Sequence, residues 1–265
     1  KVQGDGSLDT DKLLYLVQTQ PDIRMISLMA VNNETGSITA LHELVPALRR
    51  AAGSRGTGLH IHCDAVQAIG KTPLELDCGI DSLSLSAHKM GGPRGAGILW
   101  CRKKIESLNR GGGQEQGIRG GTENLFGAEA LALTLERALE PAALTEGFAK
   151  VQSLAARIIS GLPKDFTVFP PDRRAADERF SPFIIPFMHQ KLPAEALVRL
   201  LDAEGFSISS SSACSSNSGR REVLEALGLD TDSALKVARL SLGRDSEPEG
   251  VEALLKALST IQTRF

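Results

Sequence analysis

Leu59-His60-Ile61-His62-Cys63 and Ile80-Asp81-Ser82-Leu83-Ser84-Leu85 are two short stretches rich in apolar residues, and they predict two β-strands. Asp64 follows directly on the first stretch, and Lys89 comes four residues after the second. Open α/β sheets bind ligands just beyond the carboxyl ends of their strands. The two stretches therefore predict an α/β fold in which Asp64 and Lys89 share one crevice.

The sequence around these strands alternates between helical and extended patterns. Helices are predicted over Leu8–Gln18 and Leu41–Ala52, and further strands over Met25–Val31 and Gly95–Cys101. Such βαβ order indicates a mostly parallel sheet with helices on its faces. We expect residues 1–150 to form this large domain.

The second half of the chain has a different pattern. A long helix is predicted from Gly127 to Gly161, interrupted near Pro141, and a smaller α+β domain is expected after it. Its predicted elements are strands at Phe180–Phe187 and Phe206–Ser209 and helices at Ala194–Ala203 and Val251–Gln262. We place this C-terminal domain at residues 151–265.

A lysine and an aspartate in one crevice are the groups that pyridoxal 5'-phosphate requires. The lysine amine binds C4′ of the cofactor covalently, and the carboxylate keeps the pyridine nitrogen protonated, so that the ring accepts electrons. Each residue alone is weak evidence, because lysines beside glycines are mostly turn residues and aspartates after strands are mostly caps. Together, Asp64 and Lys89 predict an enzyme that depends on this cofactor.

Composition excludes several other classes of protein. The net charge of −2 and the pI near 6.3 provide no basic surface for nucleic acid. No apolar run approaches the roughly 18 residues of a membrane-spanning helix, and the chain begins without a signal-peptide pattern. We therefore expect a cytoplasmic protein with no nucleic-acid or membrane partner.

The cysteines predict neither a disulfide framework nor a zinc site. The four cysteines, Cys63, Cys78, Cys101 and Cys214, show no CxxC spacing. His60 and His62 stand near Cys63, but alternation along a strand places the two histidines on one face and the cysteine on the other. No resident metal is expected.

Five segments, in order along the chain, resemble the NifS/IscS-like cysteine desulfurases of the class V aminotransferase family. They are Asn32-Asn33-Glu34-Thr35-Gly36, Asp64-Ala65-Val66-Gln67 with Lys89, Arg119-Gly120-Gly121-Thr122-Glu123-Asn124, Ser212-Ala213-Cys214-Ser215-Ser216 and Ala238-Arg239-Leu240-Ser241-Leu242-Gly243-Arg244. The resemblance implies the fold type I architecture of pyridoxal phosphate enzymes and a homodimer. It also implies that sulfur is taken from L-cysteine as an enzyme persulfide and that L-alanine is released.

The resemblance assigns roles to the residues around the cofactor. Lys89 binds the cofactor and moves protons, and Asp64 holds the pyridine nitrogen protonated. Gln67 and Asn33 lie near the cofactor's phenolate oxygen, and Asn33 is also close to the substrate carboxylate. Turn capping is the ordinary alternative for an asparagine or glutamine in such positions.

Phosphate and carboxylate recognition are likewise assigned by resemblance. Ser86 and His88 bind the cofactor phosphate, and Thr122 reaches it from the partner subunit, which places the glycine-rich loop at the dimer interface. Arg239 binds the substrate carboxylate, a task that suits the rigid fork of a guanidinium group.

Cys214 is the predicted nucleophile. Its neighbours from Ser209 to Gly219 are almost all serine or other small polar residues, which bury little apolar surface, so an exposed loop is expected. By resemblance the thiol accepts sulfur as a persulfide and passes it to a sulfur-acceptor or iron–sulfur scaffold protein. Cys214 is also considered as a transient iron–sulfur ligand, and Arg220 and Arg221 as groups that favour its thiolate.

The family pattern includes an N-terminal segment that precedes the matched motifs and carries a phosphate-binding loop and a histidine that stacks on the pyridine ring. We expect this chain to lack that segment or to receive it from a separate N-terminal chain. Two other functions stay open on sequence alone. One is a selenocysteine lyase or another class V pyridoxal phosphate enzyme, and the other is an inactive truncated relative that binds a sulfur-acceptor scaffold.

Overall fold

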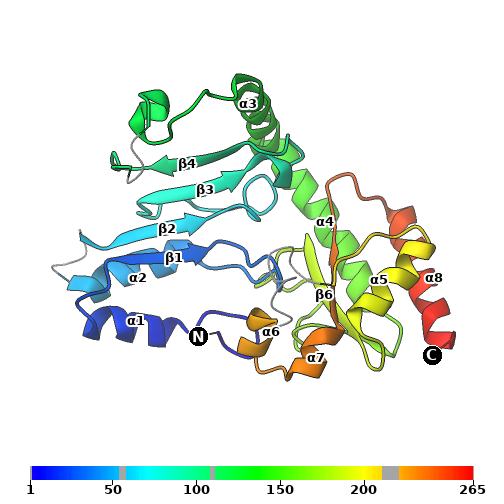
Figure 1. The fold of residues 1–265 in the computed structure, drawn as a ribbon. Coiled ribbons are helices and arrows are strands. Elements are labelled where there is room, and N and C mark those ends of the chain that lie inside the picture. The colour runs from blue at the N-terminus through cyan, green and yellow to red at the C-terminus, as the bar shows by residue number, and fades with distance from the viewer. Residues whose placement is uncertain (1, 54–57, 108–110, 211–220, 265) are drawn as a thin grey trace. The chain divides into compact units, whose positions relative to one another are not determined.

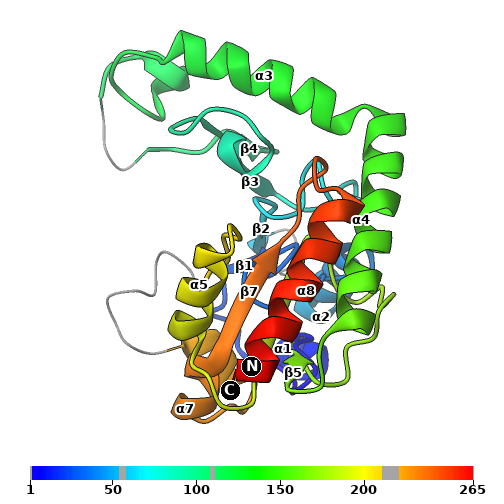
Figure 2. The ribbon, with the colours of Figure 1, turned by 90° about the vertical axis from the view of Figure 1, so that its right-hand side faces the viewer.

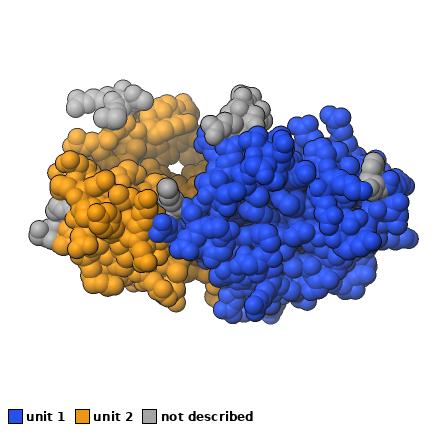
Figure 3. All heavy atoms as spheres, turned by 90° about the horizontal axis from the view of Figure 1, so that it is seen from below, with its two compact units in different colours: residues 1–9, 31–39, 145–265 blue, residues 10–30, 40–144 orange. Residues whose placement is uncertain are grey.

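The computed structural model describes residues 2–53, 58–107, 111–210 and 221–264 (Figure 1). Its packing divides the chain into two compact units, drawn in different colours in Figure 3. Unit 1 comprises residues 1–9, 31–39 and 145–265, and unit 2 comprises residues 10–30 and 40–144. Two short N-terminal segments thus belong to the same unit as the C-terminal half. The domain division predicted at residue 150 stays a prediction.

Unit 2 contains a four-stranded sheet in the order β1-β2-β3-β4. The strands are β1 (Met25–Met29), β2 (His60–Asp64), β3 (Ser82–Ser86) and β4 (Gly97–Cys101). β1, β2 and β3 pair in parallel, and β4 pairs antiparallel to β3. This confirms the predicted α/β fold with a mostly parallel sheet, which the helices α1 (Thr10–Thr19), α2 (Leu41–Ala52) and α3 (Leu125–Leu139) accompany.

Strand alternation in β2 separates apolar from polar side chains. Ile61 and Cys63 are fully buried, whereas His60, His62 and Asp64 point to the other face and are half-buried. The helix α2 buries an apolar stripe formed by Leu41, Leu44, Val45, Leu48 and Ala52, whose spacing follows the helical period. As predicted, the histidines and the cysteine lie on opposite faces.

A half-buried ion pair fastens α2 to the sheet. Arg49 of α2 donates to the carbonyls of Leu59 and Gly79 and pairs with the Asp81 carboxylate. The same carboxylate accepts the backbone N–H of Ile61 at 2.7 Å. Burial raises the pKa of Asp81, but the hydrogen bonds from Ile61 and Arg49 outweigh burial and leave the pKa below its ordinary value.

Replacement of Asp81 by asparagine is expected to lower the free energy of unfolding at pH 7 by about 1–3 kcal/mol. Because the folded-state pKa of Asp81 lies below its unfolded value, its contribution is complete above about pH 4 and is lost as pH falls through the folded-state pKa. Urea unfolding of both proteins at pH 7 and pH 3 measures this difference. If the variant loses the same amount of unfolding free energy at both pH values, the charge on Asp81 does not contribute to stability.

Unit 1 is built on a three-stranded antiparallel sheet in the order β5-β6-β7. Its strands are β5 (Phe166–Val168), β6 (Ile184–His189) and β7 (Val237–Ser241), and its helices include most of α4 (Pro141–Gly161), together with α5 (Ala194–Ala203), α6 (Glu222–Ala226), α7 (Thr231–Lys236) and α8 (Pro248–Arg264). Figure 2 shows β7 with α5 and α8 beside it. Side chains of α4, α5 and α8 form one hydrophobic core with the sheet, including Leu154, Ile158, Ile185, Phe187, Leu197, Leu240 and Leu258.

Most predicted elements of the second half are confirmed, with two corrections among the strands. The helix break between Leu139 and Pro141 and the bounds of α5 agree with the prediction. The strand predicted at 180–187 begins only at Ile184, because Ser181 instead donates its N–H to the carbonyl of Gly36. The strand predicted at 206–209 is wrong, since it is reduced to one bridge between Ser209 and Arg239.

Candidate functional site

Histidine and serine side chains form hydrogen bonds with one another across the polar face of β2 and β3. Ser82 Oγ lies 2.7 Å from His60 Nε2 and 2.8 Å from His62 Nδ1, and Ser84 Oγ lies 3.3 Å from His62 Nε2. Burial lowers the pKa of His62, and the nearby Asp64 carboxylate opposes that effect. The His62 imidazole therefore stays neutral at pH 7, and this strip of polar side chains ends at Asp64.

Asp64 is the last residue of β2 and is half-buried. Its Oδ1 accepts the N–H of Val66 at 3.0 Å, which fixes the orientation of the carboxylate, and its backbone carbonyl accepts the N–H of Ala30. Asp64 pairs in register with Ser84 of β3. The carboxylate thus lies at the carboxyl edge of two parallel strands, where the sequence predicted it.

Lys89 closes a short 3-10 turn, Ala87–Lys89, directly after β3. Ser86 ends the strand, and its Oγ lies 2.8 Å from His88 Nδ1. The chain then needs glycine at Gly92, because a Cβ there would lie 2.8 Å from Thr134 Oγ1 and 3.1 Å from the carbonyl of Ala87. This tight turn sets Ser86, His88 and Lys89 at the end of the strand that neighbours Asp64.

The remaining predicted residues of unit 2 lie in loops. Gln67 follows Asp64 in a turn, and its Oε1 accepts a hydrogen bond from Lys71 Nζ at 3.2 Å. Thr122 is exposed, and its carbonyl accepts from Arg119 Nη1 at 3.1 Å. The predicted contact of Thr122 with a partner subunit stays a prediction.

Two further predicted residues meet in unit 1. Arg239 of β7 donates from Nη1 to the backbone carbonyl of Asn33 at 2.9 Å. The turn that carries Asn33 is held by Asn32 Oδ1, which accepts the N–H groups of Glu34 and Thr35 at 2.8 and 2.9 Å. Residues 206 positions apart in sequence are thereby fixed side by side.

A buried arginine that the sequence analysis missed supports the same turn. Arg173 is 5% exposed and donates to the carbonyls of Ile184, Ser181 and Thr35. Burial lowers the pKa of Arg173 to about 10, so the group stays charged at pH 7. No local signal in the sequence marks this role, because Arg173 lies in an irregular loop and its acceptors are main-chain atoms.

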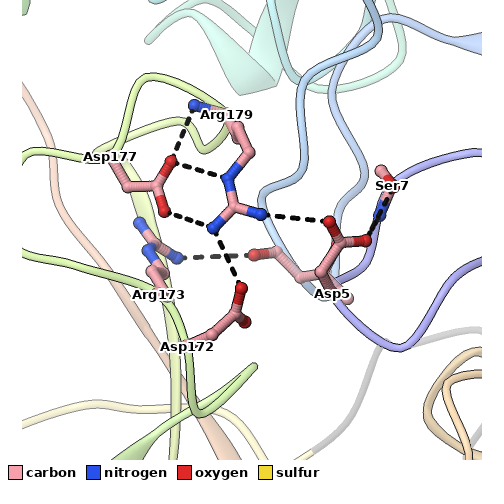
Figure 4. Close-up of polar contacts among 7 residues, drawn as sticks. Asp5, Ser7, Asp172, Arg173, Asp177 and Arg179 are labelled. Carbon is pink, nitrogen blue, oxygen red and sulfur yellow. Dashed lines mark hydrogen bonds and ion pairs between the residues drawn. The ribbon is translucent and has the colours of Figure 1, made fainter.

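Arg179, in the same loop region, forms ion pairs with three carboxylates (Figure 4). Asp5, Asp172 and Asp177 lie 3.0, 3.1 and 2.8 Å from its guanidinium nitrogens. Asp5 also accepts hydrogen bonds from both the N–H and the hydroxyl of Ser7. These contacts connect residues 1–9 to the C-terminal part of unit 1.

Cys214 lies outside the described residues, so its position stays a prediction. The residues on either side of positions 211–220 both attach to β7. Ser209 exchanges two backbone hydrogen bonds with Arg239, at 2.7 and 3.1 Å, and Arg221 donates from Nη2 to the carbonyl of Val237 at 3.2 Å. The ends of the segment that carries Cys214 are therefore held close to Arg239.

Two of the other cysteines are unsuited to nucleophilic chemistry. Cys63 is buried, and burial raises the pKa of its thiol to about 12. Burial also raises the pKa of Cys78. Because the thiolate is the nucleophile, both groups are unreactive near pH 7.

Neither a metal centre nor a membrane helix is found in the described part of the chain. Within residues 2–53, 58–107, 111–210 and 221–264, His, Cys, Asp and Glu side chains nowhere gather in threes in a way that would hold a metal ion. Among the helices of the same residues, none is long and apolar enough to cross a bilayer.

Comparison with known proteins identifies the family of the chain. The family model described as aminotransferase class V matches residues 1–254. The chain belongs to this family. An IscS-like cysteine desulfurase of Mycobacterium tuberculosis is 32% identical over 96% of the chain, and a cysteine desulfurase of Cereibacter sphaeroides is 35% identical over 98%. The chain spans 63% and 64% of the length of these relatives.

The fold of this class V family member also matches solved structures. A structure described as a NifS-like protein superposes with a TM-score of 0.84 at 30% identity, covering 100% of this chain and 67% of that one. A cysteine desulfurase described as NifS from Azotobacter vinelandii is 33% identical over 98% of the chain and is matched over 63% of its own length. The recognition from five sequence motifs is confirmed.

Class V family members depend on pyridoxal phosphate, and the residues at the strand ends fit this cofactor. A carboxylate with a fixed orientation, Asp64, suits a protonated pyridine nitrogen. The Ser86 hydroxyl and the His88 imidazole lie together as a phosphate-binding pair requires, with the Lys89 amine one residue further along. The chemistry of these groups is compatible with the cofactor, and the role of each residue toward it stays a prediction.

Proposed function

We propose that the chain provides the cofactor-binding and sulfur-accepting parts of a pyridoxal phosphate-dependent cysteine desulfurase. The observation that carries this proposal is the placement of Asp64 and Ser86 at the carboxyl ends of neighbouring parallel strands, with Lys89 on the following turn. The 32–35% identity to cysteine desulfurases supports the choice of reaction within the family.

When bound, pyridoxal phosphate would supply an electron sink for the substrate, and the residues of the chain would hold the cofactor, orient the substrate and move protons. Asp64 keeps a proton on the pyridine nitrogen, while Ser86, His88 and Thr122 bind the phosphate and Gln67 the phenolate oxygen. Lys89 Nζ binds the cofactor at rest and carries the proton of the substrate α-carbon during turnover. Asn33 and Arg239 hold the substrate carboxylate.

Sulfur transfer is assigned to Cys214. Its thiolate attacks the sulfur of the substrate, the carbon–sulfur bond of L-cysteine breaks, and the sulfur stays on the enzyme as a persulfide. The substrate carbon gains a proton and leaves as L-alanine, so the reaction needs no external oxidant or reductant. Cys214 is five residues beyond Ser209, which pairs with Arg239 on β7.

The test is Cys214→Ser, assayed with L-cysteine and pyridoxal phosphate on the purified protein together with any polypeptide that co-purifies with it. We expect persulfide to be lost and alanine release to fall at least about 100-fold, because a serine hydroxyl does not accept sulfur. Mass spectrometry detects the added sulfur, and native mass spectrometry of the same sample reports bound cofactor and companion chains.

Cys78→Ser is the matched control, because the raised pKa of Cys78 leaves it unreactive, and this variant is expected to keep the parental rate. Persulfide formed by Cys214→Ser at the parental rate would refute the proposal. The homodimer, the sulfur-acceptor or iron–sulfur scaffold partner and the cytoplasmic location rest on the resemblance and stay predictions.

A further inference from the structure

Four side chains on neighbouring parallel strands form what is here called the histidine–serine network. They are His60 and His62 of β2 and Ser82 and Ser84 of β3. Ser82 Oγ lies 2.7 Å from His60 Nε2 and 2.8 Å from His62 Nδ1, and Ser84 Oγ lies 3.3 Å from His62 Nε2. Both ring nitrogens of His62 therefore face serine hydroxyls. The proposed function assigns no role to any of the four residues.

Ser82 is the central member of this network. It is only 3% exposed, and its single hydroxyl contacts two imidazole nitrogens. A hydroxyl donates only one hydrogen bond, so at least one of the two nitrogens carries a proton and donates to Ser82 Oγ. Ser82 thus restricts which nitrogens of the two histidines carry protons, and together with Ser84 it fixes the direction of the His62 ring.

Asp64 is a competing hydrogen-bond acceptor for His62. Residues i and i+2 of a strand lie on one face, roughly 6.5 Å apart, so the His62 imidazole can turn toward the Asp64 carboxylate. Ser84 lies beside both residues, because it pairs in register with Asp64 while its hydroxyl contacts His62. Burial lowers the pKa of His62, and the charge of Asp64 opposes that effect, as expected of a carboxylate nearby.

The balance between these acceptors depends on the number of serine contacts. A hydrogen bond to a carboxylate is roughly twice as strong as one between neutral groups, so a single bond to Asp64 rivals the two bonds to Ser82 and Ser84. In the structure the two serine bonds prevail. Without the Ser82 hydroxyl only one of them is left, and the His62 ring is then expected to turn toward Asp64.

We propose that Ser82 is a positioning residue, which holds the His62 imidazole against β3 and so keeps the Asp64 carboxylate available to the pyridine nitrogen of the cofactor. An imidazole bonded to Asp64 would occupy the acceptor that the protonated pyridine nitrogen needs, and a protonated imidazole would also compete for its negative charge. The inference rests on the proposed function for the role of Asp64, whereas the hold of Ser82 on His62 is a property of the network itself.

The first measurement is a pH titration of His62 by nuclear magnetic resonance, on cofactor-free protein with 15N-labelled histidine rings and any polypeptide that co-purifies. The His62 signals are those absent from His62→Asn. Ser82→Ala is expected to raise the pKa of His62 above its wild-type value, because a bond to the Asp64 carboxylate stabilises the protonated ring. Asp64 and His60 are the titratable groups that act on this ring, and the variant keeps both.

The second measurement is the apparent dissociation constant of pyridoxal phosphate. Ser82→Ala is expected to raise it about 2- to 10-fold, the range that one hydrogen bond contributes. Ser82→Thr keeps the hydroxyl and is expected to retain the wild-type values in both measurements. Ser27→Ala is the matched control, because Ser27 of β1 also pairs in register with His62 but is exposed, and it too is expected to retain them.

An unchanged His62 pKa or an unchanged cofactor affinity in Ser82→Ala would overturn the inference, as would equal changes in Ser27→Ala. If Ser82→Ala does not fold, Ser82→Thr and Ser82→Val decide the matter, since their side chains have nearly the same shape and only threonine has a hydroxyl. Equal His62 pKa values in those two variants also overturn it. A wild-type protein that binds no pyridoxal phosphate, together with the expected rise of the His62 pKa in Ser82→Ala, would refute the proposed function and leave the hold of Ser82 on His62 standing.

Discussion

Replacement of Lys89 by alanine is expected to lower the rate of alanine formation from L-cysteine by about 1,000-fold or more. The amine of Lys89 is proposed both to hold the cofactor and to carry a proton, and general acid–base catalysis alone contributes about 100- to 10,000-fold. The position of Lys89 on the turn after β3, beside the paired Ser86 and His88, leads to this expectation.

A second readout separates loss of attachment from loss of folding. Borohydride reduction fixes the cofactor to an amine that binds it, so the mass of the wild-type chain should increase after reduction and that of Lys89→Ala should not. Lys104→Ala is the control, since Lys104 is exposed and lies beyond β4. Cofactor fixed to the Lys89→Ala chain, or alanine formed at the parental rate, would place the attachment on another lysine.

The strand ends were predictable from sequence because the signals are local. Apolar alternation located β2 and β3, and Asp64, the last residue of β2, fell at the sheet edge as expected. The helix α5 has the predicted bounds for a similar reason, since its apolar residues recur at helical spacing and bury Leu197 and Leu201.

Other parts of the fold depend on contacts between distant residues and carry no local signal. Strand β7 begins directly where α7 ends, with no turn residue between Lys236 and Val237, so periodicity does not separate the two elements. Residues 31–39 pack with the C-terminal half because Arg173 and Ser181 bond to their main chain. Main-chain acceptors look alike in any sequence, and this is why the role of Arg173 was missed.

The same distinction between local signals and long-range contacts applies to the candidate site. The cofactor-binding residues around Asp64 and Lys89 follow local strand ends and were named from sequence. The hydrogen bond from Arg239 to the carbonyl of Asn33 joins residues 206 positions apart and emerges only from the folded chain. Contacts between residues far apart in the sequence are therefore the part of the site that single-sequence reasoning does not find.

Gly36→Ala is expected to lower the free energy of unfolding by about 3 kcal/mol. Gly36 has φ +77°, a conformation that costs an L-residue roughly 1–2 kcal/mol. A Cβ at Gly36 would also lie 2.9 Å from the carbonyl oxygen of Ile184, and forcing extra volume into a packed site costs about 1–3 kcal/mol.

Gly205→Ala separates these two causes. Gly205 has φ +85°, but nothing lies within 4 Å of the position of its Cβ, so only the backbone cost of roughly 1–2 kcal/mol applies. Urea unfolding of the two variants is expected to show Gly36→Ala as clearly the less stable. Equal losses of unfolding free energy in the two variants would mean that β6 shifts to make room for the added methyl group. The turn would then move with β6, and Asn33 and Glu34 would shift relative to Arg239.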